Sequence, residues 1–214
     1  MTIKTKEFEA KTKEEALANA LEELGLKENE IVYKVEEKKG KLFKAGSVVL
    51  HVATIKDIAD YLKEALKEIV TNMGIEVNIE TNVREEQINL KMYSDNNNIL
   101  IGKGGQTLTA LTTILKQMVV KEIGKYPYIL LDVENYKEKK IGSIERMAKR
   151  VAREVSKTKI DATLENMNSY ERRIVHNILT NYKNVTTISE GEEPNRHVVI
   201  KYVDKKEKEE QSEE

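Results

Sequence analysis

The sequence predicts an α+β fold divided among three small domains. Three observations lead to this prediction: strand and helix periodicities alternate along the 214 residues, a glycine-rich loop interrupts the middle of the chain, and positive charge gathers in its last third. The predicted domains are an α/β unit at 1–54, a domain of helices and strands at 55–135 and a basic domain at 136–204. Residues 205–214 are almost uniformly charged, which predicts a disordered tail.

The first domain is predicted to contain one helix among three strands. Thr12 stands three residues before Glu15, which is the spacing of a capping box, and leucines follow at helical intervals until Gly25. Alternating apolar residues before and after this helix indicate strands. The strands are expected at 3–10, 30–37 and 47–53, with a turn at 38–41.

The second domain is predicted to begin with a helix that Thr54 and Asp57 cap and that Gly74 ends. The apolar face of this helix is expected to consist of Ile58, Leu62, Leu66 (or Ala65), Ile69 and Met73. The elements expected after it are strands at 75–81 and 88–93, a short helical turn at 95–101, a helix at 107–122 and a strand at 127–134.

The third domain is predicted to start with a long basic helix from Tyr136 to about Val155. A second helix is expected at 168–182, with Ile174, Ile178 and Tyr170 facing inward. The expected strands are 159–164, 185–189 and 197–203, and the last two form a hairpin about the turn-rich segment 191–195.

The composition excludes several functional classes. The chain has no cysteine, which rules out disulfides, thiol catalysis and cysteine-based zinc sites. His51, His176 and His197 are far apart, and no serine occupies a nucleophile elbow. There is neither a run of 18 apolar residues nor an apolar signal core at the start. We therefore expect a cytoplasmic, non-enzymatic protein without a metal, a cofactor or a membrane-inserted segment.

The glycine-rich loop is the clearest candidate binding feature. Gly102, Lys103, Gly104 and Gly105 stand immediately before a helix. Glycines let a backbone approach a ligand closely, the helix amino terminus favours an anion, and Lys103 adds a positive charge. The loop is therefore expected to clamp a phosphodiester backbone, and a simple tight turn between helices is the alternative. Its spacing fits neither a nucleoside-triphosphate P-loop nor a dinucleotide-binding loop.

Ile101 to Gly105, the helix after it and the element order resemble a KH domain of the bacterial type II arrangement, αββααβ. The resemblance implies that the loop clamps about four nucleotides of single-stranded RNA or DNA. It also implies that the bases lie in a groove, with Ile99 or Ile101 and Leu108 as candidate wall residues. Core packing is the alternative for these three residues.

A pair of side chains on the second helix of the third domain is the next candidate. Arg172 and His176 are four residues apart and share a helix face, with Arg173 beside them. Arg172 is expected to grip a phosphate, and His176 to bond a phosphate or stack on a base. The alternative is a solvated helix face with His176 packed locally. Arg196, just after the turn, is expected to reach the same surface.

The long helix upstream carries a further basic group. Between Tyr136 and Lys159 there are nine basic residues and three acidic ones. The spacing places most of four basic residues on one side, where they would attract phosphates. These residues are Arg146, Lys149, Arg150 and Arg153. Ordinary solvated charge is the alternative.

Arg172-x-x-x-His176, before a hairpin, resembles the R-three-H domain, a single-stranded nucleic-acid-binding module of helices on a three-stranded sheet. The small α/β unit, the KH domain and this module, in that order, resemble the bacterial Jag (KhpB) family over about residues 1–204. The chain departs from the family at Gly104, where a second basic residue is common, and at 136–139, where lysines replace arginines. Segment 40–43 also replaces the family's first-domain turn.

The resemblance implies a non-enzymatic RNA-binding protein that acts as an RNA chaperone or regulator. It further implies a smaller KH-domain partner protein and a link to cell elongation and cell-wall homeostasis. Two alternatives stay open. One is a protein-interaction scaffold that docks a membrane insertase or division partner and uses the KH fold to form a homodimer. The other is a single-stranded DNA binder, because the loop does not distinguish the two sugars.

Overall fold

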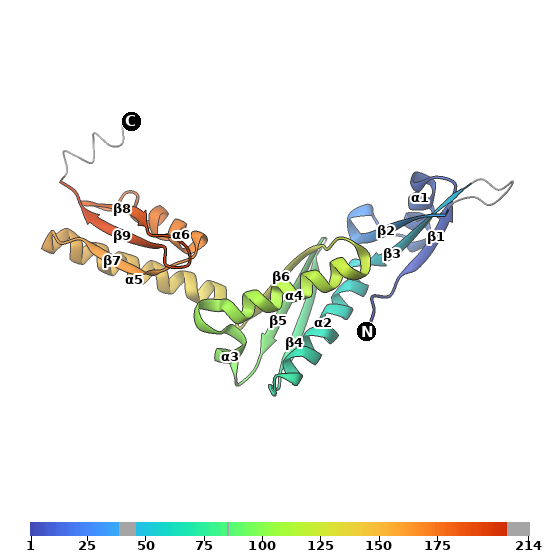
Figure 1. Cartoon of the computed structure of the whole chain (residues 1–214), viewed down its shortest axis with the longest axis horizontal. Helices are drawn as coiled ribbons and strands as arrows, with labels where there is room; N and C mark the ends of the chain where they lie inside the picture. The colour runs from blue at the N-terminus through green and yellow to red at the C-terminus, as the bar shows by residue number, and fades with distance from the viewer. Residues whose placement is uncertain (39–45, 85, 205–214) are drawn as a thin grey trace. The chain divides into compact units, whose positions relative to one another are not determined.

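The computed structural model describes residues 1–38, 46–84 and 86–204 (Figure 1). The expected turn at 38–41, the segment 40–43 and the tail at 205–214 therefore lie wholly or mostly outside the described residues. The chain forms two compact units, of which the first is Met1–Glu134 and the second begins at Asn135. Three separate three-stranded sheets, each with its own helices, confirm the predicted α+β fold class.

The first sheet has the strand order β1-β3-β2 and is antiparallel throughout. Its elements are β1 (Lys6–Ala10), α1 (Lys13–Leu24), the 3-10 helix η1 (Glu28–Glu30), β2 (Ile31–Lys38) and β3 (Ser47–Thr54). Helix α1 begins as predicted, because the Thr12 hydroxyl accepts the Glu15 N–H at 3.2 Å, and it ends at Gly25 with φ +64°. The fully buried Ala16 and Ala20 let α1 lie close to the sheet.

The second sheet also belongs to the first unit and has the order β4-β5-β6. Its elements are α2 (Ile55–Asn72), β4 (Asn78–Arg84), β5 (Gln87–Tyr93), α3 (Asn97–Ile101), the 3-10 turn η2 (Lys103–Gly105), α4 (Gln106–Ile123) and β6 (Tyr128–Val133). Strand β6 runs parallel to β5, so a crossover must join them, and α3, η2 and α4 provide it. This is the predicted order αββααβ, with the glycine loop inside the crossover.

The core of this domain corrects the predicted face of α2. Val70 is completely buried, whereas Ile69 is half-buried and Met73 is 43% exposed. Ile58, Leu62, Leu66 and Ala65 are buried as predicted, and the buried face extends to Tyr61 and Val70 instead of Ile69 and Met73. Strand β4 begins at Asn78 rather than at 75, although Ile75 itself is buried.

The second unit folds around a sheet of order β7-β9-β8. Its elements are α5 (Tyr136–Thr158), β7 (Ala162–Asn166), α6 (Ser169–Leu179), β8 (Val185–Glu190) and β9 (His197–Tyr202). Helix α5 is longer than predicted: it ends at Thr158, where Lys159 caps it with a left-handed φ of +60°, so β7 starts later than expected. The predicted inward position of Tyr170 is wrong, since its side chain is 62% exposed. Ile174 and Ile178 are partly buried and pack against the core as predicted, while the fully inward positions of α6 are Arg172, Val175 and Leu179.

Candidate nucleic-acid interface

Three glycines with positive φ form the turn between α3 and α4. Their φ angles are +72° at Gly102, +62° at Gly104 and +90° at Gly105, a range that residues with a Cβ rarely adopt. A Cβ at Gly102 would lie 2.2 Å from Thr107 Oγ1, whereas one at Gly104 would meet no atom within 4 Å. Packing therefore requires glycine at 102, and only the backbone angle favours it at 104.

The tip of the loop is open to solvent. Lys103 and Gly104 are exposed, and α4 begins directly afterwards at Gln106. Within the described residues, no side chain caps the amino terminus of α4, and its first turn contains no acidic residue. The helix dipole and the first-turn N–H groups therefore favour an anion here, and Lys103 adds a mobile positive charge. This arrangement suits one phosphate group of a nucleic-acid strand.

The three candidate groove residues have different environments. Ile99 is 54% exposed and Ile101 is half-buried, so both can contact a ligand beside the loop. Leu108 is 3% exposed and faces the core, so its predicted place in a groove wall is wrong. Its position in the first turn of α4, on the side that packs against the sheet, explains the burial.

The basic residues of α5 form a stripe, which we call the α5 stripe. It consists of Arg146, Lys149, Arg150 and Arg153, and all four side chains are exposed. Spacings of three, one and three residues keep them on one side of the helix. The opposite side packs into the core of the second unit through Ile144, Ala148, Ala152 and Val155. The α5 stripe therefore faces solvent, where phosphates can reach it.

The buried position of Arg172 does not agree with its predicted contact with a phosphate. The residue is only 7% exposed. Its Nη1 atom donates to the Met167 carbonyl oxygen at 2.6 Å and to Glu193 Oε1 at 2.9 Å. The guanidinium therefore lies between the β7–α6 corner and the β8–β9 loop, and it presents little surface to a phosphate. Glu193 is 60% exposed, so the ion pair joins a buried arginine to a surface carboxylate. Direct phosphate contact by Arg172 would require the guanidinium to leave both Glu193 and the Met167 carbonyl oxygen.

His176 also makes a contact inside the fold. Its Nδ1 atom lies 2.7 Å from Thr187 Oγ1, so the ring joins α6 to β8. Burial lowers the pKa of His176 below its ordinary value of 6.5, and the nearby Arg172 charge lowers it further. The ring is therefore mostly neutral near pH 7. It can share a hydrogen bond with Thr187 but does not supply a permanent positive charge.

We expect the second unit to lose stability as the pH falls below about 6.5. The unfolded chain has the ordinary His176 pKa and the folded chain a lower one, so the unfolded state binds more protons in this range. His176→Gln should remove part of this pH dependence, measured by thermal unfolding of the full chain at several pH values. His197→Gln, which removes another imidazole of the same unit, serves as the control. Equal pH dependence in all three proteins would contradict the assignment.

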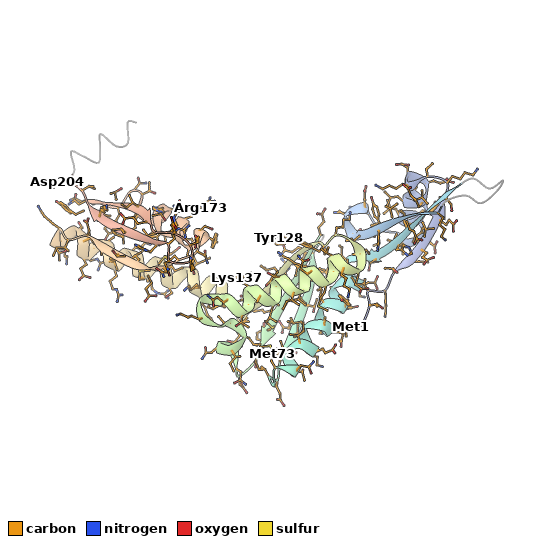
Figure 2. The ribbon with its side chains drawn as sticks, in the orientation of Figure 1. Met1, Met73, Tyr128, Lys137, Arg173 and Asp204 are labelled. Atoms are coloured by element: carbon orange, nitrogen blue, oxygen red, sulfur yellow. The ribbon has the colours of Figure 1, made fainter. Side chains whose placement is uncertain are left out.

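The two remaining arginines are accessible. Arg173, labelled in Figure 2, is exposed on α6, and Arg196 is exposed at the end of the β8–β9 loop. The sequence did not indicate the residues that form hydrogen bonds with Arg172 and His176, namely Met167, Thr187 and Glu193. One signal was present: Arg172 falls in register with the buried Val175 and Leu179, which is the spacing of a core-facing position.

The described residues contain no group of three or more histidine, cysteine, aspartate or glutamate side chains that could hold a metal ion. In that same part of the chain, no helix combines the length and apolar character needed to cross a membrane.

Comparison with protein families matches all three domains. A Jag N-terminus model matches residues 8–49, a KhpA/KhpB KH-domain model matches 59–130 and an R-three-H domain model matches 142–202. The glycine loop lies in the second match, and Arg172 and His176 lie in the third. These matches define the class: a protein in which a Jag amino-terminal domain, a KH domain and an R-three-H domain follow one another.

Similar proteins narrow the class further. The chain is 39% identical over 196 residues to the RNA-binding protein KhpB of Clostridium symbiosum, covering 89% of this chain and 88% of that protein. It is 32% identical over 196 residues to the RNA-binding protein KhpB of Bacillus subtilis (strain 168), covering 88% and 94%. The chain belongs to the KhpB family, which confirms the resemblance seen in the sequence.

Proposed function

We propose that this protein binds single-stranded RNA without catalysis, through two surfaces that act together. One is the open glycine loop of the KH domain, and the other is the α5 stripe with Arg173 and Arg196. The observation that carries the proposal is the exposed loop tip at the uncapped start of α4, which lies within the domain matched to the KhpA/KhpB family. The similar KhpB proteins are named as RNA-binding, which supports RNA as the ligand.

The presence of two RNA-binding surfaces on one chain explains how a loop with a single positive charge can contribute to RNA binding. The loop contributes one lysine, so its own affinity is expected to be low. A second surface on the same chain raises the effective concentration of the strand and can increase the overall affinity about 100-fold or more. The phosphate contacts are supplied mainly by the α5 stripe, while the loop holds one stretch of backbone.

The wider cellular role is part of the same proposal. We place the protein in the cytoplasm as an RNA chaperone or regulator with a smaller KH-domain partner, linked to cell elongation and wall homeostasis. These statements follow from the resemblance to the family drawn from the sequence, and the printed names of the similar proteins support RNA binding alone. The alternatives of a scaffold and of a DNA binder are separated by the experiment below.

The test changes the loop without disturbing its packing. Gly102 is avoided, because any side chain there would strike Thr107. Lys103→Asp with Gly104→Asp places two negative charges at the tip, while Lys103→Asn with Gly104→Asn gives nearly the same shapes without charge. Asp and Asn both tolerate left-handed backbone angles. We expect the Asp pair to reduce crosslinking to cellular RNA by about tenfold or more and the neutral pair to have a much smaller effect.

Unchanged RNA recovery with the Asp pair would exclude the loop as a clamp and favour the scaffold. Competition between an RNA of about 20 nucleotides and DNA of the same sequence decides the sugar preference, since only RNA presents a 2′-hydroxyl. Stronger competition by DNA would favour the DNA-binding alternative.

A further inference from the structure

We propose that Arg172 and His176 are positioning residues that hold the β8–β9 hairpin, and through it Arg196, in place for nucleic acid. In this arrangement, the Arg172-x-x-x-His176 motif does not itself contact a phosphate. The proposal rests on the proposed function, because it concerns how the RNA surface of the second unit is built. It assigns direct contact to Arg196 and Arg173 and an indirect role to the two motif residues.

The first support is the pair of hydrogen bonds that the Arg172 side chain makes. Arg172 Nη1 joins the Met167 carbonyl oxygen, just before α6, to the Glu193 carboxylate in the β8–β9 loop. Arg172 is 7% exposed, whereas the Glu193 side chain is 60% exposed, so a buried residue holds a loop residue at the surface. Arg172 thus connects the start of its own helix to a loop that follows much later in the sequence.

The second support is that the same corner holds the end of the loop. The Met167 N–H donates to the Arg196 carbonyl oxygen at 2.9 Å, and Asn166 Nδ2 donates to Asn195 Oδ1 at 3.1 Å. Arg172 holds the loop at Glu193, and these two bonds hold it again where β9 begins. The backbone that carries Arg196 is therefore fixed on both sides of Pro194, which directs the exposed Arg196 side chain.

The third support comes from His176. Its bond to Thr187 fixes β8, the strand that leads into the same loop. One motif residue therefore holds the strand, and the other holds the loop that follows. Their spacing of four residues places both on one side of α6, toward the hairpin. The spacing of the motif is thus explained by contacts within the fold.

A competing interpretation makes Glu193 a substitute for phosphate that RNA displaces from Arg172. The two interpretations predict opposite signs for one substitution. Glu193→Ala removes both a negative charge and the contact with Arg172. If Arg172 were a phosphate site, removing Glu193 would free it and tighten RNA binding. If Arg172 positions the loop, the same change loosens Arg196 and weakens binding.

Glu192→Ala is the matched control, because Glu192 is the neighbouring exposed residue of the same loop and carries the same charge. With the full chain and a single-stranded RNA of about 20 nucleotides, Glu192→Ala should leave the affinity unchanged or tighten it by about twofold. Glu193→Ala should weaken it by about threefold to tenfold despite losing a negative charge. Tighter binding by Glu193→Ala would overturn the proposal.

A double-mutant cycle separates positioning from general destabilisation. Glu193→Ala is repeated in a chain that also carries Arg196→Gln. If Glu193 acts through Arg196, its substitution should have almost no further effect there. An equal loss of affinity in both backgrounds would overturn the proposal.

Hydrogen exchange tests the contact without RNA. In the full chain, Glu193→Ala should speed amide exchange across the loop at 191–197, whereas Glu192→Ala should not. Equal exchange in the two variants would overturn the proposal. If the wild-type chain failed to bind the RNA, the proposed function would fall, and the exchange result would still decide whether Arg172 holds the loop.

Discussion

Replacing Gly102 with alanine is expected to lower the free energy of unfolding of the first unit by about 2–6 kcal/mol. Gly102 has φ +72° and ψ 178°, a region that almost only glycine adopts, and this conformation costs another residue about 1–3 kcal/mol. Overpacking adds about 1–3 kcal/mol, because the new Cβ would lie 2.2 Å from Thr107 Oγ1. The Thr107 backbone nitrogen is also only 2.9 Å away, so Thr107→Ala can relieve only part of the strain.

Gly104→Ala is the control for this prediction. Its φ of +62° and ψ of 12° lie in the ordinary left-handed helical region, and its Cβ would meet no atom within 4 Å. We therefore expect a loss of about 1–2 kcal/mol from the backbone angle alone. Urea unfolding of the full chain, followed at signals of the first unit, measures both variants. Equal losses for the two would show that the close approach of Gly102 to Thr107 does not matter.

Neutralising the α5 stripe is expected to have the largest effect on RNA affinity. The variant carries Arg146→Gln, Lys149→Gln, Arg150→Gln and Arg153→Gln. Each phosphate contact with a single strand contributes about 0.7 to the slope of log affinity against log salt, so four contacts contribute about 3. We expect the slope to flatten by about that amount and the affinity to fall about 100-fold or more at low salt.

The control variant loses the same number of positive charges from the first unit and keeps the α5 stripe. Glutamine replaces four exposed lysines of the first unit, Lys4, Lys34, Lys56 and Lys67. These lysines are spread over several elements and form no stripe. The salt slope should change little, because long-range attraction between exposed charges is largely screened beyond about 10 Å. Equal losses in the two quadruple variants would mean that net charge, rather than the α5 stripe, drives binding.

Much of the fold was predictable because its signals are local. The Thr12–Glu15 and Thr54–Asp57 spacings marked two helix starts, and both caps are present in the structure. Gly25 ends its helix with the left-handed angle that its position predicted. The element order around the glycine loop likewise identified the αββααβ domain. Such features depend on residues three or four apart, so no knowledge of the tertiary fold is needed.

Helix rotation was harder to predict. The apolar pattern of α2 predicted Ile69 in the core, but packing buries the neighbouring Val70 instead. Leu108 could equally line a groove or fill the core, and it fills the core. Hydrophobicity indicates that a side chain can be buried, but the neighbouring sheet determines which candidates are.

By itself, the sequence determined the presence of the three domains, the place of the glycine loop and the one-sided spacing of the α5 basic residues, because turn glycines and helical spacing are short-range properties. Only the tertiary structure decided the position of Arg172. Its partner Glu193 is 21 residues away, and the contact exists only after β8 and β9 have paired and brought their loop to the start of α6. In a sequence, a charged side chain indicates a surface group, and it can be buried only where the fold supplies acceptors for its hydrogen bonds.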